Sequence, residues 1–107
     1  MYKKNTQTTT FAGLVSSPVY VDSQITSGII IPVDAAFNLI TLSVQVSTDG
    51  QNFYNLYDDT GAPKTISIGS GRAIFFDLGS YAGFAYIQFT ASASLNGKTI
   101  TVIFREV

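Results

Sequence analysis

Apolar and polar residues alternate with a period of two through most of this chain. In residues 39–47, LITLSVQVS, apolar side chains occupy every second position, and most residues between them are Thr, Ser or Gln. Residues 85–92 (AYIQFTAS) and 98–106 (KTITVIFRE) repeat the pattern. Because successive side chains of a β-strand point to opposite faces, this period predicts half-buried strands. The inward-facing residues are predicted to be Ile40, Leu42, Val44, Val46, Ala85, Ile87, Phe89, Ala91, Ile100, Val102 and Phe104.

Shorter apolar runs and turn sequences complete the predicted architecture. PVYVD, GIII, TISIG and RAIFFD, all within residues 18–77, are four further candidate strands. Turn formers such as Asp49-Gly50 and Asn96-Gly97 separate the runs. About eight strands at spacings of about 8–12 residues predict an all-β fold, a single antiparallel β-sandwich or barrel. Helical turns are expected only briefly, within residues 34–40 and 80–84.

The organisation of the chain favours one domain. Its 107 residues show no linker and no internal repeat. Residues 1–13 are polar, rich in threonine and without a clear period, so we predict a flexible N-terminal arm over 1–13 and a β-sandwich domain over 14–107. The two lysines near the start precede no apolar run, so no secretory signal is expected, and the initial Met suggests a complete small gene product.

Composition weighs against several classes of function. Histidine and cysteine are absent, which removes the commonest general base and the commonest transition-metal ligands. We therefore expect no enzyme, no cofactor and no metal centre. The net charge is −1 and charged residues are 12 % of the chain, about half the usual share, so we expect no nucleic-acid partner. No apolar run approaches the length of about 18 residues that a membrane helix needs, so no membrane partner is expected.

Residues 46–61, VSTDGQNFYNLYDDTG, hold the densest cluster of acidic and aromatic side chains. A catalytic carboxylate pair would require Asp58 or Asp59 to meet Asp77 in a cleft. We favour a structural interpretation, in which the Asp49-Gly50 turn closes a hairpin and the two adjacent acids open the next turn. An alternative is a calcium site with oxygen ligands from Asp49, Asn52, Asp58, Asp59 and Thr60. The spacing of these residues does not match an EF-hand loop.

Two further features admit a ligand-binding interpretation. GSGR, residues 69–72, is rich in glycine, but no helix pattern and no Lys follow it, so a tight turn is favoured over a phosphate loop. The aromatic residues could form a sugar or base platform, although the core and interfaces are their more usual place in a sandwich. These aromatic residues are Tyr54, Tyr57, Phe75, Phe76, Tyr81, Phe84 and Tyr86.

Two family resemblances involve the same hairpin. Residues 44–53, VQVSTDGQNF, resemble a hairpin of galactose-binding-like (discoidin-type) sandwiches, which bind sugar or lipid through loops at one end. Residues 39–107 more broadly resemble small β-sandwich structural proteins of tailed bacteriophages, through the DG hairpin, LYDDTG, FDLGSYAGFAYIQF and a last strand containing Arg. Within that group, the resemblance implies a capsid decoration (cement) protein with a jelly-roll-like fold that often assembles as a trimer.

These resemblances lead to two functional expectations. The first is a structural virion protein on the capsid surface that binds the major capsid protein and forms a homo-oligomer, as a trimer. Its arm would contact partners through Tyr2, Lys3, Lys4 and Phe11. The alternative is a module of a phage tail or fibre that binds carbohydrate or a host surface through the loops around residues 49–57 and 81–84.

Overall fold

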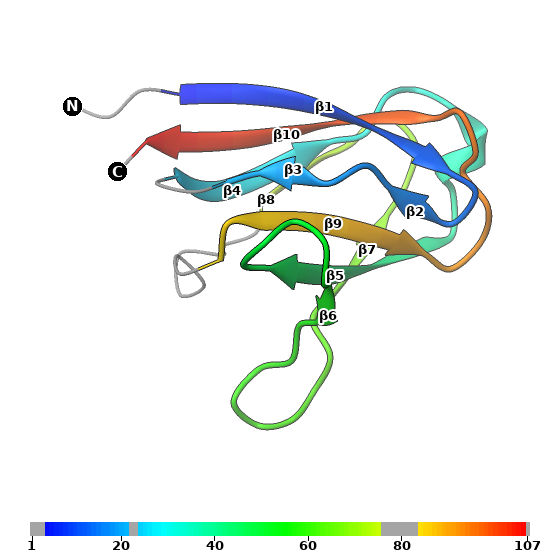
Figure 1. Ribbon diagram of the computed structural model, residues 1–107. Coiled ribbons are helices and arrows are strands. Elements are labelled where there is room, and N and C mark those ends of the chain that lie inside the picture. The colour runs from blue at the N-terminus through cyan, green and yellow to red at the C-terminus, as the bar shows by residue number, and fades with distance from the viewer. Residues whose placement is uncertain (1–3, 22–23, 76–83, 107) are drawn as a thin grey trace.

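The predicted all-β, antiparallel fold is confirmed. The structure, a computed structural model, describes residues 4–21, 24–75 and 84–106. In these ranges it contains ten strands and one 3-10 turn, and every strand pair is antiparallel (Figure 1). The elements are β1 (Lys4–Ala12), β2 (Val15–Ser16), β3 (Val19–Tyr20), β4 (Gln24–Ile30), η1 (Ala35–Phe37), β5 (Ile40–Ser47), β6 (Tyr54–Asn55), β7 (Thr65–Ile68), β8 (Ala73–Phe75), β9 (Tyr86–Ala91) and β10 (Thr99–Glu106).

The strand pairing is nested, as in a jelly roll. β1 pairs with β10, β3 with β9, β4 with β8, and β5 with β7. The first strand therefore pairs with the last. Moving inward from both ends of the chain, each later strand of the first half pairs with an earlier strand of the second half. Pairing of β10 with β4 and of β9 with β5 then joins these ribbons into two sheets. Sheet A has the order β1–β10–β4–β8, and sheet B has β9 between β5 and the short strands β2 and β3.

Alternation along the strands builds the core between the two sheets. All the inward positions predicted on β5 and β10 are buried, and so are Ile87, Phe89 and Ala91 on β9. Ala85, just before β9, is only half-buried. Fully burying a side chain of this size contributes about 1.5–3 kcal/mol, so this apolar cluster is the main source of stability. The short helical turn predicted within residues 34–40 is present as η1. The one predicted within 80–84 lies outside the described residues except for Phe84.

The predicted division into an arm (residues 1–13) and a sandwich is wrong for residues 4–12. These residues form β1, which pairs with β10 from Lys4↔Arg105 to Thr10↔Thr99. Thr9 and Phe11 are 2 % and 1 % exposed, respectively. The pattern was hard to detect because threonine, which favours strands, occupies both faces of β1. The buried Thr9 is accommodated because its hydroxyl donates a hydrogen bond of 2.7 Å to the carbonyl of Ser17.

An irregularity between β2 and β3 is repaired by a side chain. Val15 pairs with Thr90 and Val19 with Ile87, so four steps on one strand oppose three on the other, which is a β-bulge. Pro18, which lacks a backbone N–H, lies in the interrupted stretch. The backbone N–H of Phe89 instead donates to the buried hydroxyl of Ser16 at 2.8 Å. One side chain thus replaces a backbone acceptor that the bulge removes.

Replacing Ser16 with Ala should destabilise the fold, because it removes the acceptor of a buried N–H. The expected loss in the free energy of unfolding is about 1–3 kcal/mol, measured by urea denaturation. Ser67→Ala is the matched control, since Ser67 is an exposed strand serine, and its effect should stay within about 0.5 kcal/mol. Equal effects of the two substitutions would show that the hydroxyl of Ser16 does not support the bulge.

Candidate interaction surfaces

The turn at Asp49 is scaffold, as the structural interpretation predicts. The carboxylate of Asp49 accepts hydrogen bonds of 2.9 Å from the backbone N–H groups of Gln51 and Asn52, and from the hydroxyl of Ser47. The side chain of Asn52 donates another at 2.8 Å. These bonds, the one from the backbone of Asn52 first, hold the pKa of Asp49 well below its ordinary value. Every one of these partners lies in the turn itself, so the carboxylate is occupied locally.

The second acidic turn forms the tip of a projecting hairpin. The N–H of Lys64 donates to the carbonyl of Leu56, and the N–H of Asp58 donates to the carbonyl of Ala62, both at 2.8 Å. Residues 57–63, called the finger below, therefore leave the sheet and return to it at adjacent points, and they project away from both sheets (Figure 1). The carboxylate of Asp58 accepts from the hydroxyl of Thr60 at 2.6 Å, which is the main reason that its pKa is lowered.

Acidic residues do not converge in the described part of the chain. No group of three His, Cys, Asp or Glu residues there could hold a metal ion. The proposed calcium ligands Asp49 and Asp58 satisfy their own turns, and Asp59 accepts no hydrogen bond from any described residue. Asp77, the third acid of the carboxylate-pair hypothesis, lies outside the described residues.

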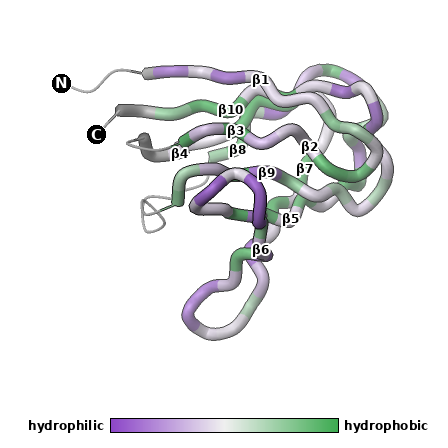
Figure 2. The backbone as a smooth tube through the Cα atoms, viewed as in Figure 1, coloured by the Kyte–Doolittle hydropathy of each residue, from purple (hydrophilic) through white to green (hydrophobic). Residues whose placement is uncertain are grey.

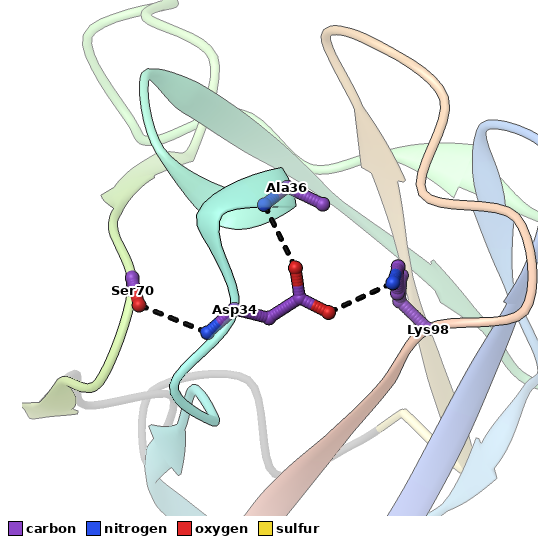
Figure 3. Close-up of polar contacts among 4 residues, drawn as sticks. All are labelled: Asp34, Ala36, Ser70 and Lys98. Carbon is purple, nitrogen blue, oxygen red and sulfur yellow. Dashed lines mark hydrogen bonds and ion pairs between the residues drawn. The ribbon is translucent and has the colours of Figure 1, made fainter.

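A third acid, Asp34, pins the loop that follows β4. Its carboxylate accepts from the N–H of Ala36 at 2.9 Å, which caps η1, and from Lys98 Nζ at 2.8 Å (Figure 3). The hydrogen bond from Lys98 is the largest cause of the lowered pKa of Asp34. Both side chains are partly exposed, so the ion pair adds little stability. Its effect is positional, because it joins residues far apart in the sequence.

The predicted aromatic residues that the structure describes lie in different surroundings. Tyr54 and Tyr57 are 68 % and 54 % exposed at the base and side of the finger, whereas Leu56 between them is buried. Phe84 packs against the core, and Tyr81 lies outside the described residues. An aromatic pair that the sequence analysis missed lies on the outer face of sheet B, where the rings of Tyr20 and Tyr86 meet edge to face with centroids 5.1 Å apart.

A row of side-chain amides runs beside that aromatic pair. Gln88 Nε2 donates to Gln45 Oε1 at 2.7 Å, and Gln45 Nε2 donates to Asn55 Oδ1 at 2.9 Å. The row therefore crosses three strands, β9, β5 and β6. Register places it next to the tyrosines, since Tyr86 and Gln88 are two residues apart on β9 and share its outer face. This face carries polar groups but no charge.

The outer face of sheet A is formed mainly by threonine and apolar residues, away from the Lys4↔Arg105 pair at the end of β1 and β10. Cross-strand register brings Thr8 opposite Thr101 and Thr10 opposite Thr99, and the hydroxyls of Thr10 and Thr99 share a hydrogen bond of 2.9 Å. Apolar residues continue the face on β4 and β8. We call this surface the Thr–Ile face; its members are Thr6, Thr8, Thr10, Gly28, Ile30, Ala73, Phe75, Thr99, Thr101 and Ile103.

A shallow hollow of about 240 Å³ lies at the apolar end of the Thr–Ile face. Ser27 is an extra residue in β4, because Gly28 pairs with Ile103 and Thr26 with Phe104. A side chain at position 28 would begin 2.7 Å from the carbonyl oxygen of Ile74, so glycine is needed there, and its bare backbone leaves the floor open. Phe75 stands beside the hollow and is 81 % exposed. An aromatic ring this exposed on a sheet surface is a potential anchor for a protein partner.

β1 leaves the edge of sheet A open along Lys4–Thr10. Backbone groups in an antiparallel strand point alternately toward and away from the partner strand. The N–H of Phe11 donates toward β10, to Lys98, whereas the carbonyl of Thr10 accepts from Ser17 on the other side. The backbone groups of Thr6 and Thr8 therefore face the open edge, where no described strand lies. Figure 1 shows β1 at the outer margin of the fold, and Figure 2 shows it less hydrophobic than β10 beside it.

The four predicted partner-binding residues have different outcomes. Phe11 is buried in the core, so its prediction as a surface contact is wrong: as an inward residue of β1, it packs between the sheets. Lys4 begins β1 at the open edge. Tyr2 and Lys3 lie outside the described residues.

In the part of the chain that the structure describes, no helix is long and apolar enough to cross a membrane.

The open edge predicts an alternating pattern of amide hydrogen exchange along β1. The N–H groups of Gln7 and Thr9, which face β10, should exchange slowly, and those of Thr6 and Thr8 should exchange fast. Two-dimensional NMR after transfer to deuterated water at low protein concentration measures all four. Equal protection of the four amides would mean that this edge is already covered.

The lowered pKa of Asp49 predicts a dependence of stability on pH. A carboxylate whose pKa is lowered by folding stabilises the folded state above its ordinary value of 3.8, and this contribution is lost as the pH falls below that value. The stability difference between the wild type and Asp49→Asn should therefore shrink between about pH 5 and pH 2, as followed by thermal melting. Thr48→Ala, which changes an exposed and uncharged neighbour of Asp49, is the control and should parallel the wild type. A constant difference for Asp49→Asn would contradict the assignment.

Comparisons with known proteins give one structural similarity. No protein-family model matches the chain, and no curated protein sequence matches it. Among solved structures, the fold is similar to that of the SPBc2 prophage-derived protein YomS, with a TM-score of 0.59 and 13 % identity. The similarity covers 99 % of this chain and 96 % of that one. The two proteins therefore share a fold over their whole lengths.

Proposed function

We propose that the protein is a structural component of a bacteriophage virion, a capsid decoration protein that binds and stabilises the head shell from the capsid surface. The observation that carries this proposal is the joining of an open sheet edge, β1, to the uncharged Thr–Ile face. The prophage origin of YomS, whose fold is similar, supports a phage context. The protein would act without catalysis and without a cofactor, through the surfaces that it covers.

The edge and the face suit this role for different reasons. Backbone groups of Thr6 and Thr8 can pair with an extended segment of the major capsid protein, because strand addition requires no particular side chain. The Thr–Ile face can pack against a neighbouring subunit without removing charges from water, which is costly when they are left unpaired. A stable contact of this kind covers about 800 Å² on each partner.

Multiple copies would strengthen a contact that is modest for a single copy. Part of the binding energy of each copy is offset by the loss of translational and rotational freedom and by ordering at the interface. When copies are linked as a trimer, the second and third contacts become intramolecular and form at a high effective concentration. A trimeric arrangement on the shell would therefore bind more tightly than three separate copies.

A second candidate function is a module that binds carbohydrate on a host surface. The observation that favours it is the Tyr20–Tyr86 pair beside the amide row of Gln45, Gln88 and Asn55. Aromatic rings can pack on the apolar face of a sugar, and amides can hydrogen-bond to its hydroxyls. Binding on a glycan array that is lost in Tyr20→Ala, together with no binding to shells, would favour this candidate over decoration.

The decoration proposal predicts that the protein binds shells of the phage that encodes it when these are assembled without it. Co-sedimentation should show saturable binding, and bound shells should resist heat better than bare shells. Thr8→Pro should weaken binding about tenfold or more, because proline removes an edge donor. It should spare the fold, since the N–H of Thr8 does not face β10. Thr101→Lys should weaken binding by placing a charge in the Thr–Ile face.

Thr65→Lys is the control for these variants, because it adds the same charge to an exposed position on β7 in sheet B. It should bind shells as the wild type does. Failure of the wild type to bind shells would end the proposal. Normal binding by both Thr8→Pro and Thr101→Lys would rule out sheet A as the contact.

A further inference from the structure

A groove lies at the end of sheet B between the start of β5 and the end of β7. It has a volume of about 660 Å³, and its two walls are formed by residues 38–41 and by residues 67–69 with Arg72. Ser70 ties these walls together, because its N–H donates to Asn38 Oδ1 at 3.0 Å. Its hydroxyl accepts from the N–H of Asp34 at 2.9 Å, and Asp34 is held in turn by Lys98 (Figure 3). The groove is therefore formed before anything binds in it.

Arg72 places an uncompensated positive charge in this groove. A Cβ atom at position 69 would lie 2.9 Å from the guanidinium carbon, so Arg72 packs directly over the bare backbone of Gly69. Among the described residues, Lys98 and Asp34 form an ion pair, in which Arg72 takes no part. No described carboxylate lines the groove. A guanidinium presents a planar fork of N–H donors that matches a carboxylate.

Leu39 adds an apolar contact beside that charge. It is 98 % exposed, and its φ of 59° lies in the left-handed region, which a branched apolar side chain rarely adopts. Such strain persists only when the surrounding structure holds it, and it is concentrated at binding sites. An exposed leucine next to an unpaired arginine fits an occupant that presents an apolar or aromatic group next to a carboxylate.

The finger of the same chain has this chemistry. Asp59 lies at its tip and accepts no hydrogen bond from the described residues, whereas Asp34, Asp49 and Asp58 are all engaged. Tyr57, two residues earlier, is 54 % exposed. Within one molecule the finger projects away from both sheets, so it can meet a groove only on another copy (Figure 1).

We propose that the groove receives the finger of a second copy, with Asp59 against the Arg72 guanidinium and Tyr57 against Leu39. Finger and groove are different surfaces, so the contact runs head to tail and closes into a ring when the rotation allows it. The contact between finger and groove could hold the proposed trimer together, and in that respect the inference rests on the proposed function. It does not use β1 or the Thr–Ile face, which stay free for the shell.

Charge exchange tests this contact on the full chain. Sedimentation velocity over a concentration series should show that the wild type self-associates and that added salt weakens the association. Arg72→Glu and Asp59→Lys should each raise the dissociation constant about tenfold or more, because each places like charges together. The double variant Arg72→Glu/Asp59→Lys should recover the association, which would also show that neither substitution acts by unfolding the chain.

The matched control separates a specific contact from net charge. Arg72→Gln and Thr6→Glu each lower the net charge by one, but only Arg72→Gln should weaken self-association. A wild type that stays monomeric throughout the series would overturn the inference, and so would single variants that associate normally. Shell binding is tested with the β1 variants, and self-association with the variants of the finger and the groove. Failure of one proposal can therefore be distinguished from failure of the other.

Discussion

The pairing of β1 with β10 is the constraint on which the rest of the fold depends. It joins the two ends of the chain, and nested pairing of the remaining strands follows inside it. β1 then crosses between the sheets, since Thr10 pairs with Thr99 in sheet A and Phe11 with Ser16 in sheet B. Because long-range pairs of this kind close most of the chain into a loop, they are costly to form and cooperative once formed. The buried ring of Phe11 helps to hold the two sheets together at this crossing.

Sequence alternation predicted the strands whose two faces differ in polarity, and it failed where they do not. β5, β9 and β10 were found because apolar and polar residues alternate along most of their length. β1 was missed because threonine fills inward and outward positions alike, and Thr9 is buried only because Ser17 provides an acceptor. Strand existence is a local property of the sequence, whereas the satisfaction of a buried hydroxyl depends on a residue elsewhere in the fold.

The candidate surfaces were less predictable than the strands, for the same reason. The turn role of Asp49 could be inferred from the Asp-Gly dipeptide, because its hydrogen bonds are local. The Thr–Ile face could not, since its members come from four strands and meet only through their register. The groove is equally non-local. The left-handed backbone of Leu39 could not be predicted either, because positions with this backbone conformation usually hold glycine.

Local use of the acidic residues keeps carboxylates away from the Thr–Ile face and from the amide row. Asp34, Asp49 and Asp58 each bind donors within their own turn, so these carboxylates order loops instead of lying on the strands. Natural proteins usually protect an open strand edge with charges, proline or a bulge. On the open edge of β1, Lys4 provides a charge at the start, but the positions from Asn5 to Thr10 have no charge, proline or bulge: the bulges lie in β4 and between β2 and β3, and Pro18 is off the edge. An edge without such protection is prone to pair with any extended chain that it meets, and this liability becomes useful when the partner is a fixed neighbour that covers the edge.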